Sequence, residues 1–484
     1  MKRFYPTIRV FGVLLTGVSL TLLVPLLLSW HWQDGAESAY DEAFLLTFGT
    51  GLGLWWTARR EKRELKVRDG FLMVVMVWTL LPIYAGLPLI LHLNISFTDA
   101  YFEAVSGLTT TGATVLANLD KLPPSINLWR GMLVWMGGMG LVVLAVAVLP
   151  LLGIGGRQMF KAETPGPMKD SQLTPRLTQT AKGLWVVYGA ITLACILGLK
   201  WAGMDWFDAV MHSFTTMGLG GFSSHDASFG YWDSPAIEAV TIFFMLLAGI
   251  NFATHFLAIH GRTLTPYRHD PEIVWYLVTV IGSVVGIAIY LAVLEVYPDF
   301  GTALRFAAFN VVSIATTTGF ANTDYNLWPM AAPLWMLFLC SFTTSAGSTG
   351  GGIKMIRAII LYKQVYRELV RAMHPSAVWP VRIGDGSVPQ NILTAVLAFG
   401  FAYMCIIVAL TLLMAFSGLD IVTGFSAVVA SLNNTGPGLN QVGPATTFEV
   451  LTDFQTWVCT FAMLLGRLEI FTLLVVLTPE FWRK

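Results

Sequence analysis

Four short runs of small or hydroxyl-bearing residues end on a glycine, and each run lies between long apolar segments of the chain. The runs are LTTTG (108–112), MGLGG (217–221), ATTTG (315–319) and LNNTG (432–436). Backbone carbonyls can replace the hydration shell of a cation, and glycine reaches the backbone angles that turn successive carbonyls toward one side. Four such loops at one membrane depth, placed around one axis, predict a cation filter.

The rest of the chain alternates long apolar spans with shorter semi-polar stretches. Of its 484 residues, 55% are hydrophobic and 12% are charged, which is typical of polytopic membrane proteins. Apolar spans occur at 9–30, 40–57, 70–92, 130–153, 183–201, 236–259, 273–296, 331–340 with 353–361, 391–417 and 455–478. The semi-polar stretches are 99–109, 205–217, 300–315 and 420–432. They are shorter than the roughly twenty residues that a spanning helix needs, which favours re-entrant segments.

The distribution of charge predicts the orientation of the chain. The net charge is zero, because 29 lysines and arginines balance 29 acidic residues. When the loops are assigned alternately to the two sides, most basic residues fall on one side. They include the cluster at 59–68, Arg157, Lys161, Lys169, Arg176 and Lys182, and a second cluster at 354–382. The positive-inside rule then places both termini in the cytoplasm and the four glycine runs outside.

A helical hairpin followed by four repeats accounts for this order. The hairpin comprises residues 1–66, and the repeats comprise 67–160, 161–262, 263–380 and 381–484. We expect an all-α integral membrane protein whose helix–pore-loop–helix repeats stand pseudo-fourfold around one pore. A carboxylate opens each short helix (Asp99, Asp205, Asp299 and Asp420), where it would cap free N–H groups. The negative ends of the four helix dipoles would converge on a partly hydrated cation.

The second glycine run departs from the other three. It contains no hydroxyl and offers more than one candidate glycine; Gly221 keeps the spacing from the short helix and precedes Phe222, as Gly319 precedes Phe320. A single glycine in a membrane protein more often serves helix packing, so the filter prediction rests on the fourfold recurrence. The predicted ion-binding residues are Thr110, Thr111, Gly112, Leu219, Gly220, Gly221, Thr317, Thr318, Gly319, Asn434, Thr435 and Gly436.

A polar run of small residues, SFTTSAGSTGGG at 341–352, interrupts the second membrane helix of the third repeat. Its backbone cannot face lipid, because the polar groups would be unsatisfied. A cytoplasmic loop is one interpretation, and a mobile plug beneath the filter is the favoured one, because so few apolar residues precede the run. A phosphate-binding loop does not fit the pattern. The predicted gate residues in the run are Ser345, Gly347, Gly350, Gly351 and Gly352.

Arg467 joins these gate residues. It lies near the middle of the span 455–478, where a charge costs roughly 2.5–3.5 kcal/mol on insertion scales. Two interpretations remain open: an ion pair with another helix, or a cation in the pore wall below the filter. Glu469 lies two residues away on another face of the helix and is a poor direct partner. His212, in the second short helix, is expected to be a hydrogen-bonded structural residue. No catalytic set, metal-ligand spacing or nucleotide fingerprint stands out, so neither an enzyme nor a cofactor is predicted.

Three phrases identify a resemblance to a known family. HSFTT (212–216), GFS (221–223) with HDAS (225–228), and TTTGF (316–320) resemble the TrkH-type bacterial potassium uptake proteins. These belong to a superfamily that includes KtrB and the plant and fungal HKT and Trk transporters. The resemblance covers essentially the whole chain. It implies a fold related to a potassium channel tetramer within one chain, an intramembrane gate at 341–352 and a basic residue at the position of Arg467.

The same resemblance implies a substrate and partners. Glycine in all four loops favours potassium, whereas sodium-preferring relatives carry serine at the first position, which here is Gly112. The resemblance also implies a homodimer in the bacterial inner membrane and a separate cytosolic TrkA-like subunit with nucleotide-binding domains.

Potassium uptake through a channel-like pore is the predicted function, with the potassium ion as the transported ligand. Each elementary charge gains about 2.3 kcal/mol per 100 mV of inside-negative potential, so no pump chemistry is required. The alternative is a secondary symporter that couples potassium to protons or sodium, for which Glu469 is the candidate acidic residue. The expected surroundings are the lipid bilayer, a second copy and the cytosolic subunit, without nucleic acid.

Overall fold

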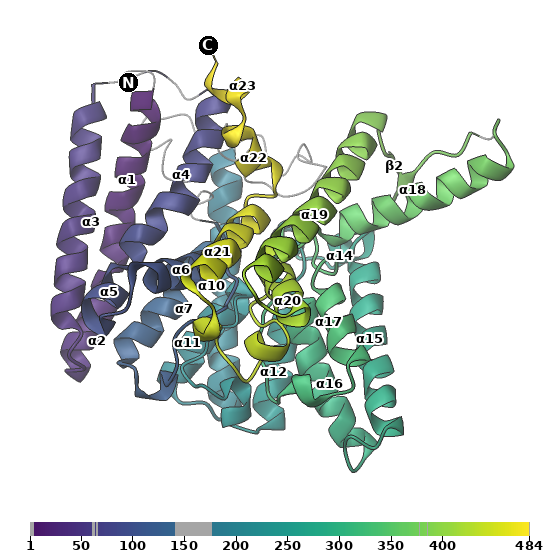
Figure 1. The fold of residues 1–484 in the computed structure, drawn as a ribbon, viewed down its shortest axis with the longest axis horizontal. Helices are drawn as coiled ribbons and strands as arrows, with labels where there is room; N and C mark the ends of the chain where they lie inside the picture. Colours follow the sequence, from purple (N-terminus) through teal and green to yellow (C-terminus); the bar gives the residue numbers. More distant parts are fainter. Residues whose placement is uncertain are drawn as a thin grey trace.

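The computed structural model describes residues 4–60, 63, 66–140, 177–376, 378–384 and 386–483. At the N-terminus, α1 (Tyr5–Thr21) and α2 (Leu23–Trp32) run on from each other, and α3 (Glu37–Ala58) returns beside them (Figure 1). Two glycines allow this close approach. A Cβ on Gly12 would lie 2.8 Å from the carbonyl oxygen of Gly51, and a Cβ on Gly51 would lie 2.5 Å from the Thr16 hydroxyl. Small residues let apolar helices pack backbone to backbone.

The remaining helices follow the order that the sequence predicts, and each of four units contains one of the predicted semi-polar helices, α6, α11, α16 or α20. The first unit contains α4 (Val67–Ala85), α5 (Leu87–Leu93), α6 (Phe97–Leu108) and α7 (Pro124–Gly138). The second contains α10 (Leu177–Ala202), α11 (Trp206–Gly218), α12 (Pro235–Ala248), α13 (Phe252–Gly261) and α14 (Thr265–His269). The third contains α15 (Ile273–Val293), α16 (Phe300–Ala315), α17 (Ala331–Leu339) and α18 (Met355–Met373). The fourth contains α19 (Gln390–Phe416), α20 (Ile421–Leu432), α21 (Asp453–Arg467), α22 (Phe471–Leu477) and α23 (Pro479–Trp482).

Irregular structure is confined to the connections. Single 3₁₀ turns occur at Leu119–Lys121, Ser228–Tyr231, Tyr325–Leu327, Asn440–Val442 and Phe448–Val450. Two short strands, β1 (Arg382–Ile383) and β2 (Gly386–Ser387), pair antiparallel beyond α18, with Arg382 opposite Ser387. Both chain ends lie together at the top of Figure 1, whereas the turn between α15 and α16 lies at the bottom.

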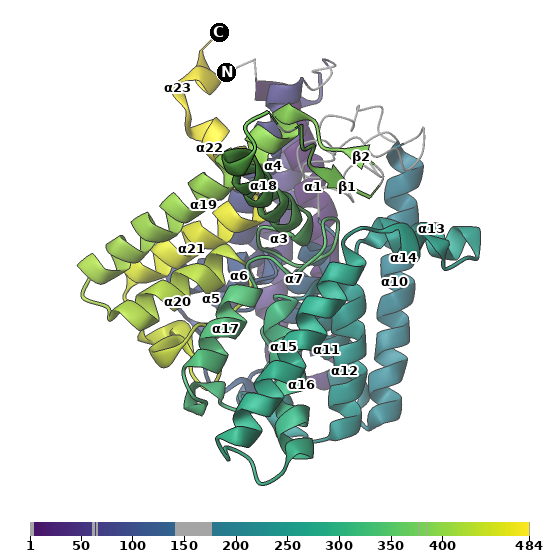
Figure 2. The same cartoon turned by 90° about the vertical axis from the view of Figure 1, so that its right-hand side faces the viewer.

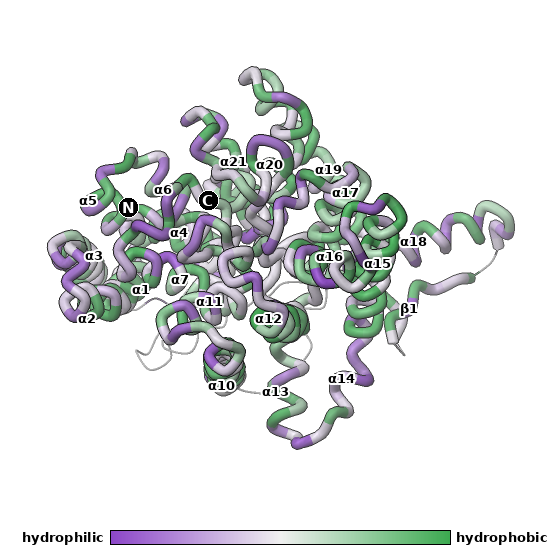
Figure 3. The backbone as a smooth tube through the Cα atoms, turned by 90° about the horizontal axis from the view of Figure 1, so that it is seen from below, coloured by the Kyte–Doolittle hydropathy of each residue, from purple (hydrophilic) through white to green (hydrophobic). Residues whose placement is uncertain are grey.

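The outer helices present apolar side chains to the surroundings. Large hydrophobic residues are exposed along α15 and α19, such as Val278, Ile281, Phe401, Met404 and Val408. Figure 3 shows hydrophobic residues along the outer helices of the bundle. Within the described residues, five helices are long and apolar enough to cross a membrane, or seven if each of two bent helix pairs forms one span. These surfaces fit a lipid environment.

Two spans that the sequence predicts as continuous are broken. Helices α12 and α13 are bent by 93°, and α21 and α22 are bent by 112°. The first break follows Gly249, and the Asn251 side chain then caps α13 by accepting the Ala253 N–H at 2.9 Å. At the second break, Glu469 and Ile470 adopt φ values of 52° and 56°, which end a right-handed helix. Arg467 is therefore the last residue of α21, and not a residue in the middle of a span.

The short helices begin nearly where the sequence predicts, with one correction. Asp205, Asp299 and Asp420 cap α11, α16 and α20, and each side chain accepts the N–H group three residues later. The prediction is wrong for α6, because Ser96 is its cap and Asp99 stands in the first turn. The Ser96 hydroxyl accepts the Asp99 N–H and donates to the Asp99 carboxylate.

Parts of the predicted organisation fall outside the described residues. These are the end of the span 130–153, the boundary between 160 and 161, and Arg157, Lys161, Lys169 and Arg176. In the third unit, α18 does not carry the chain on across the bundle. It projects sideways from the other helices (Figures 1 and 2).

Candidate functional site

The four glycine-ended runs adopt the same backbone conformation. In each run a residue with positive φ precedes the glycine by two positions: Thr110 (57°), Leu219 (54°), Thr317 (60°) and Asn434 (53°). The glycines themselves have φ values of 78° (Gly112), 55° (Gly221), 89° (Gly319) and 100° (Gly436), which favour glycine. The second run, whose sequence departs most, matches the others when Gly221 is the aligned glycine. We call these segments (109–112, 218–221, 316–319 and 433–436) the glycine loops.

Hydrogen bonds from each glycine loop to its own short helix also repeat. The residue between the two positive-φ positions donates its N–H to a carbonyl five residues earlier. The four bonds are Thr111 to Ser106 (2.8 Å), Gly220 to Thr215 (3.0 Å), Thr318 to Ser313 (2.8 Å) and Thr435 to Ala430 (2.9 Å). Each loop is thereby held against the C-terminal end of a helix, where the helix dipole places partial negative charge.

The four glycine loops contact one another in a closed ring. A Cβ added to Gly112, Gly221, Gly319 or Gly436 would lie closer than 3.0 Å to a carbonyl oxygen of the following loop. Those oxygens belong to Gly220, Thr318, Thr435 and Thr111, respectively. The contacts run from the first loop to the second, third and fourth and back to the first. Only glycine fits at these four positions without displacing a neighbouring backbone.

Side-chain hydrogen bonds link residues within the glycine loops and between them. The hydroxyls of Thr109 and Thr111 are 2.8 Å apart, and those of Thr316 and Thr318 are 2.7 Å apart. The Asn434 amide donates to the Thr111 hydroxyl at 3.0 Å, which ties the fourth loop to the first. The predicted filter residues therefore come together, and the side chains of Thr111, Thr318 and Asn434 form hydrogen bonds within and between the loops.

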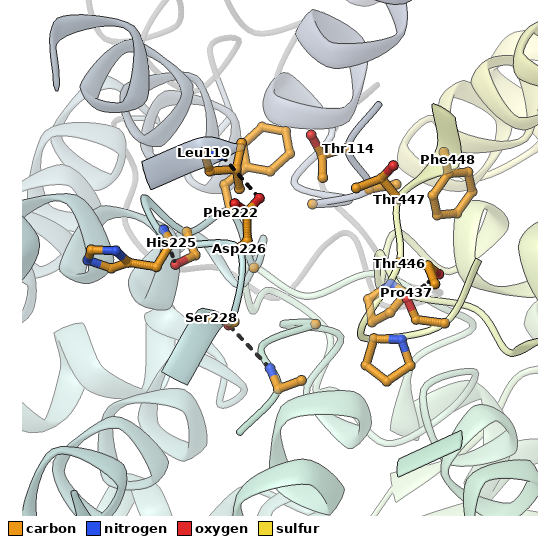
Figure 4. Close-up of a pocket in the computed structure, with 18 of the residues that line it drawn as sticks. Thr114, Leu119, Phe222, His225, Asp226, Ser228, Pro437, Thr446, Thr447 and Phe448 are labelled. Carbon is orange, nitrogen blue, oxygen red and sulfur yellow. Dashed lines mark hydrogen bonds between the residues drawn. The ribbon is translucent and has the colours of Figure 1, made fainter. Parts of the chain in front are cut away.

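A solvent-open cavity of about 80 Å³ lies on one side of the ring. Residues that follow the glycines in all four units line it, including Thr114, Phe222, Ala321 and Pro437 (Figure 4). Among the described residues, no group of three His, Cys, Asp or Glu side chains is placed to hold a metal ion. The cavity opens onto the ring, because Gly112, Gly221 and Gly319 are among the residues that line it.

Sequence analysis did not predict the buried ion pair beside this cavity. The Arg130 Nε lies 2.8 Å from a carboxylate oxygen of Glu103, and both side chains are fully buried. Arg130 also donates to the Ser223 carbonyl at 3.1 Å and stacks on the Phe222 ring, with 4.3 Å to the ring centre. The pair thus joins the segments that follow the first and second glycine loops. The charge of Arg130, at the start of the apolar span 130–153, could have indicated a buried partner.

A second network, nearer the surface, joins the first and second units through the segments beyond their glycine loops. His225 lies 2.5 Å from a carboxylate oxygen of Asp120 and 3.1 Å from one of Asp208. Burial by itself would lower the pKa of His225, but the hydrogen bonds and charges of the two carboxylates raise it above its usual value. His212 is hydrogen-bonded at both ring nitrogens, to the Asp208 carbonyl and the Ser223 hydroxyl, as a structural residue would be.

The loop at 341–352 lies on the opposite side of the ring. It contacts residues that precede the glycines: the Gly351 N–H donates to the Thr317 hydroxyl at 2.9 Å, and the Thr349 hydroxyl donates to the Met217 carbonyl at 2.9 Å. A Cβ on Gly351 would collide with the Asn433 carbonyl. Ser345 and Gly347 lie farther from the ring, where backbone bonds of 3.0 Å join them to the break between α12 and α13. Gly352 packs against the carbonyls of Cys340 and Ser341.

Two cationic side chains hold this loop through its carbonyl groups. The Nη1 of Arg467 donates to the Thr349 carbonyl at 3.2 Å, and the Nη2 of Arg467 donates to the carbonyls of Gly137 and Gly138. Lys354, which sequence analysis did not single out, donates to the Gly350 carbonyl. Its position two residues after the glycine run could have indicated a contact with the loop. Arg467 ends α21, where the helix dipole favours a positive charge. Glu469 pairs with Arg357 at 2.7 Å.

A protein with several apolar helices long enough to cross a membrane, and with a ring of four glycine loops beside a cavity, fits the class of cation transport proteins. Comparisons with known proteins give the same class. A family model described as "TrkH: Cation transport protein" matches residues 37–484. The chain belongs to this family, which confirms the resemblance inferred from the sequence and the prediction of a transporter rather than an enzyme.

Individual relatives extend over nearly the whole chain. The "Trk system potassium uptake protein TrkH" of Halomonas elongata is 46% identical over 480 residues, covering 99% of both chains. The protein of the same name from Salmonella typhimurium is 45% identical over 478 residues, covering 98% of this chain and 99% of its own. The crystal structure of the potassium transporter TrkH from Vibrio parahaemolyticus matches with a TM-score of 0.90 at 43% identity, covering 99% of this chain and all of that one.

Proposed function

We propose that this protein takes up potassium through a single channel-like pore whose selectivity filter is the ring of glycine loops. The observation that carries the proposal is the closed ring of four equivalent loops, each packed against the backbone of the next. In this arrangement the four repeats stand pseudo-fourfold around one axis. Relatives over nearly the full length are named as potassium uptake proteins, which supports potassium as the substrate.

Potassium would bind to backbone carbonyls of the twelve predicted filter residues. Carbonyl dipoles replace water around the ion without placing an ionised side chain in its path. The C-terminal ends of α6, α11, α16 and α20 adjoin the loops and add partial negative charge. Glycine in all four loops, including Gly112, supports a preference for potassium over sodium.

The 341–352 loop would act as the gate. It lies directly under the ring and is held there by hydrogen bonds to the third loop, to α11 and to Arg467. Because these are bonds to single carbonyl and hydroxyl groups, a displaced loop could open the path without unfolding any helix. Arg467 contributes both by holding the loop and by placing a positive charge next to it.

We further propose the orientation and the partners that the sequence implies. Both termini and α18 would face the cytoplasm of a bacterium, with the mouth cavity on the periplasmic side of the inner membrane. The protein would form a homodimer, and a TrkA-like cytosolic subunit would regulate the gate. Charge asymmetry of the loops supports the orientation.

Rubidium flux into proteoliposomes of the purified chain tests the transport mechanism. We expect uptake driven by an inside-negative potential alone, with a pH or sodium gradient adding nothing. Symport remains the alternative outcome: uptake that requires a proton or sodium gradient would contradict the channel proposal. The ion pair of Glu469 with Arg357 supports the channel, because a coupling carboxylate needs to change its protonation or its ligand during the cycle.

Deletion of residues 348–351 tests the gate. We expect higher rubidium flux without the cytosolic subunit, because the shortened loop no longer reaches the ring. The matched control deletes 262–265, four exposed residues that comprise the connection between α13 and α14 and the first residue of α14. A folded deletion variant with the basal flux of the unmodified protein would contradict the gate.

A further inference from the structure

Two backbone N–H groups, one on each side of the glycine run 350–352, donate to one carboxylate that lies outside the 341–352 loop. Glu272 immediately precedes α15, and its Oε2 accepts the Ala346 N–H at 2.9 Å and the Ile356 N–H at 3.1 Å. These two donors lie on opposite sides of the glycine run. The Glu272 side chain is only 6% exposed. Removing an acceptor that two buried backbone N–H groups share is costly, because both donors then lose their partner.

The loop is also closed on itself above this carboxylate. The Met355 N–H donates to the Thr344 carbonyl at 2.8 Å, and the Thr344 hydroxyl donates to the Gly351 carbonyl at 2.8 Å. The chain entering the loop and the chain leaving it are therefore joined before either reaches Glu272. Any movement of the closed loop relative to α15 has to stretch or break the two bonds to this side chain.

Two of the attachments of the loop thus lie at its opposite ends. Its tip contacts the ring through Gly351 and Thr349, and its base is attached to α15 through Glu272. The acidic neighbour Asp270 faces elsewhere: one of its oxygens accepts the Glu272 N–H at 2.9 Å and the other accepts the Thr254 hydroxyl at 2.8 Å. Two acidic residues of the same segment therefore differ in whether they touch the loop.

We propose that Glu272 is a positioning residue that holds the 341–352 loop under the ring, and that its carboxylate sets the balance between closed and open conformations. The inference rests on the proposed role of the loop as the gate. Backbone N–H groups that lose a buried partner are costly, so the bonds to Glu272 favour the conformation in which both are formed.

The test measures rubidium flux without the cytosolic subunit for Glu272→Ala and Glu272→Gln. The control is Asp270→Asn, which changes a neighbouring carboxylate that does not bond the loop. Each substitution is made in the full-length chain and in the chain lacking residues 348–351, a deletion that spares both N–H donors. Potassium-to-sodium permeability ratios and thermal stability in detergent are measured on the same preparations.

We expect Glu272→Ala to raise basal flux about tenfold, which corresponds to about 1.4 kcal/mol in the closed-to-open equilibrium. Glu272→Gln should give a smaller increase, because the amide oxygen can still accept, and Asp270→Asn should resemble the unmodified chain. The permeability ratio should not change. In the shortened chain Glu272→Ala should add nothing, since two changes that act through one element are not additive.

The outcomes separate this inference from the gate itself. A shortened chain with unmodified basal flux overturns the gate and the role of Glu272 together. A shortened chain with raised flux, combined with a folded Glu272→Ala variant of normal flux, overturns the role of Glu272 alone. If Glu272→Ala raises flux equally in the full-length and the shortened chain, Glu272 acts through an element other than the loop, and the proposal is overturned. Failure of both Glu272 variants to fold, while Asp270→Asn folds, assigns the side chain to folding and also overturns the proposal.

Discussion

Replacing Arg467 by methionine tests how the cation beneath the ring acts. The substitution keeps an unbranched side chain of similar length and removes the guanidinium group. Arg467 donates to the Thr349 carbonyl of the 341–352 loop and to the carbonyls of Gly137 and Gly138 at the end of α7. The first bond holds the loop, and the other two hold the arginine in place.

The expected magnitude follows from these contacts. A hydrogen bond to a charged group contributes about 1.5–3 kcal/mol, and of the three bonds named, the one to Thr349 is made to the 341–352 loop. At the lower value the ratio of closed to open conformations falls about tenfold, so basal flux should rise by a similar factor. Stability should fall modestly, because Arg467 also interacts with the C-terminal end of the α21 dipole, which contributes about 0.3–1 kcal/mol for an exposed charge.

Arg467→Lys separates two ways in which the side chain could act. Lysine keeps the charge but lacks the planar fork that reaches Thr349 and α7 at once. If the arginine holds the loop through its fork, both variants should show raised rubidium flux. If the positive charge repels ions in the pathway, Arg467→Met should show raised flux and Arg467→Lys should not. Folded Met and Lys variants that both keep the unmodified flux would refute both mechanisms.

Three further substitutions test the ring and its mouth. Gly112→Ser should lower the potassium-to-sodium permeability ratio in bi-ionic reversal potentials, because φ is 78° and a Cβ would displace the carbonyl of the second loop; an unchanged ratio would remove this glycine from the filter. The pKa of His225 is raised in the folded protein, so its network should stabilise the protein fully below its ordinary pKa of 6.5 and lose that contribution as the pH rises through the higher folded value. The melting temperature of His225→Gln should depend less on pH across this range than that of the unmodified chain. An unaltered pH dependence would contradict the assignment. Glu103→Ala should cost about 3–5 kcal/mol by leaving Arg130 buried without its carboxylate, and a normal melting temperature and yield in detergent would show that the pair contributes little.

Local patterns in the sequence predicted the short helices well. The stretch 300–315 coincides with α16 (Phe300–Ala315), and 420–432 differs from α20 (Ile421–Leu432) by one residue. In both, an aspartate caps the first turn and a run ending in glycine stops the helix, so both limits depend on neighbouring residues. At α6 the same reasoning chose Asp99, although Ser96 is the cap, because both residues are good caps and the sequence does not rank them.

Contacts between distant segments could not be predicted from the sequence. Arg130 and Glu103 come from different helices of the first unit, and nothing in a single sequence indicates that they pair. Glu272 meets the 341–352 loop across 74 residues of chain. The breaks after α12 and α21 were missed for a related reason: hydropathy averages over a window and does not register a bend whose hydrogen bonds are replaced by tertiary partners.

The amino-acid sequence by itself determined the class of the protein, its repeated order of helices and the positions of the four glycines, because apolar length, capping residues and glycine act over a few neighbouring residues. The tertiary structure alone decided that each glycine faces the carbonyl of the next loop and that Arg467, Lys354 and Glu272 hold the 341–352 loop from three directions. These contacts join residues far apart in the chain, and their geometry depends on how whole helices pack rather than on any local preference.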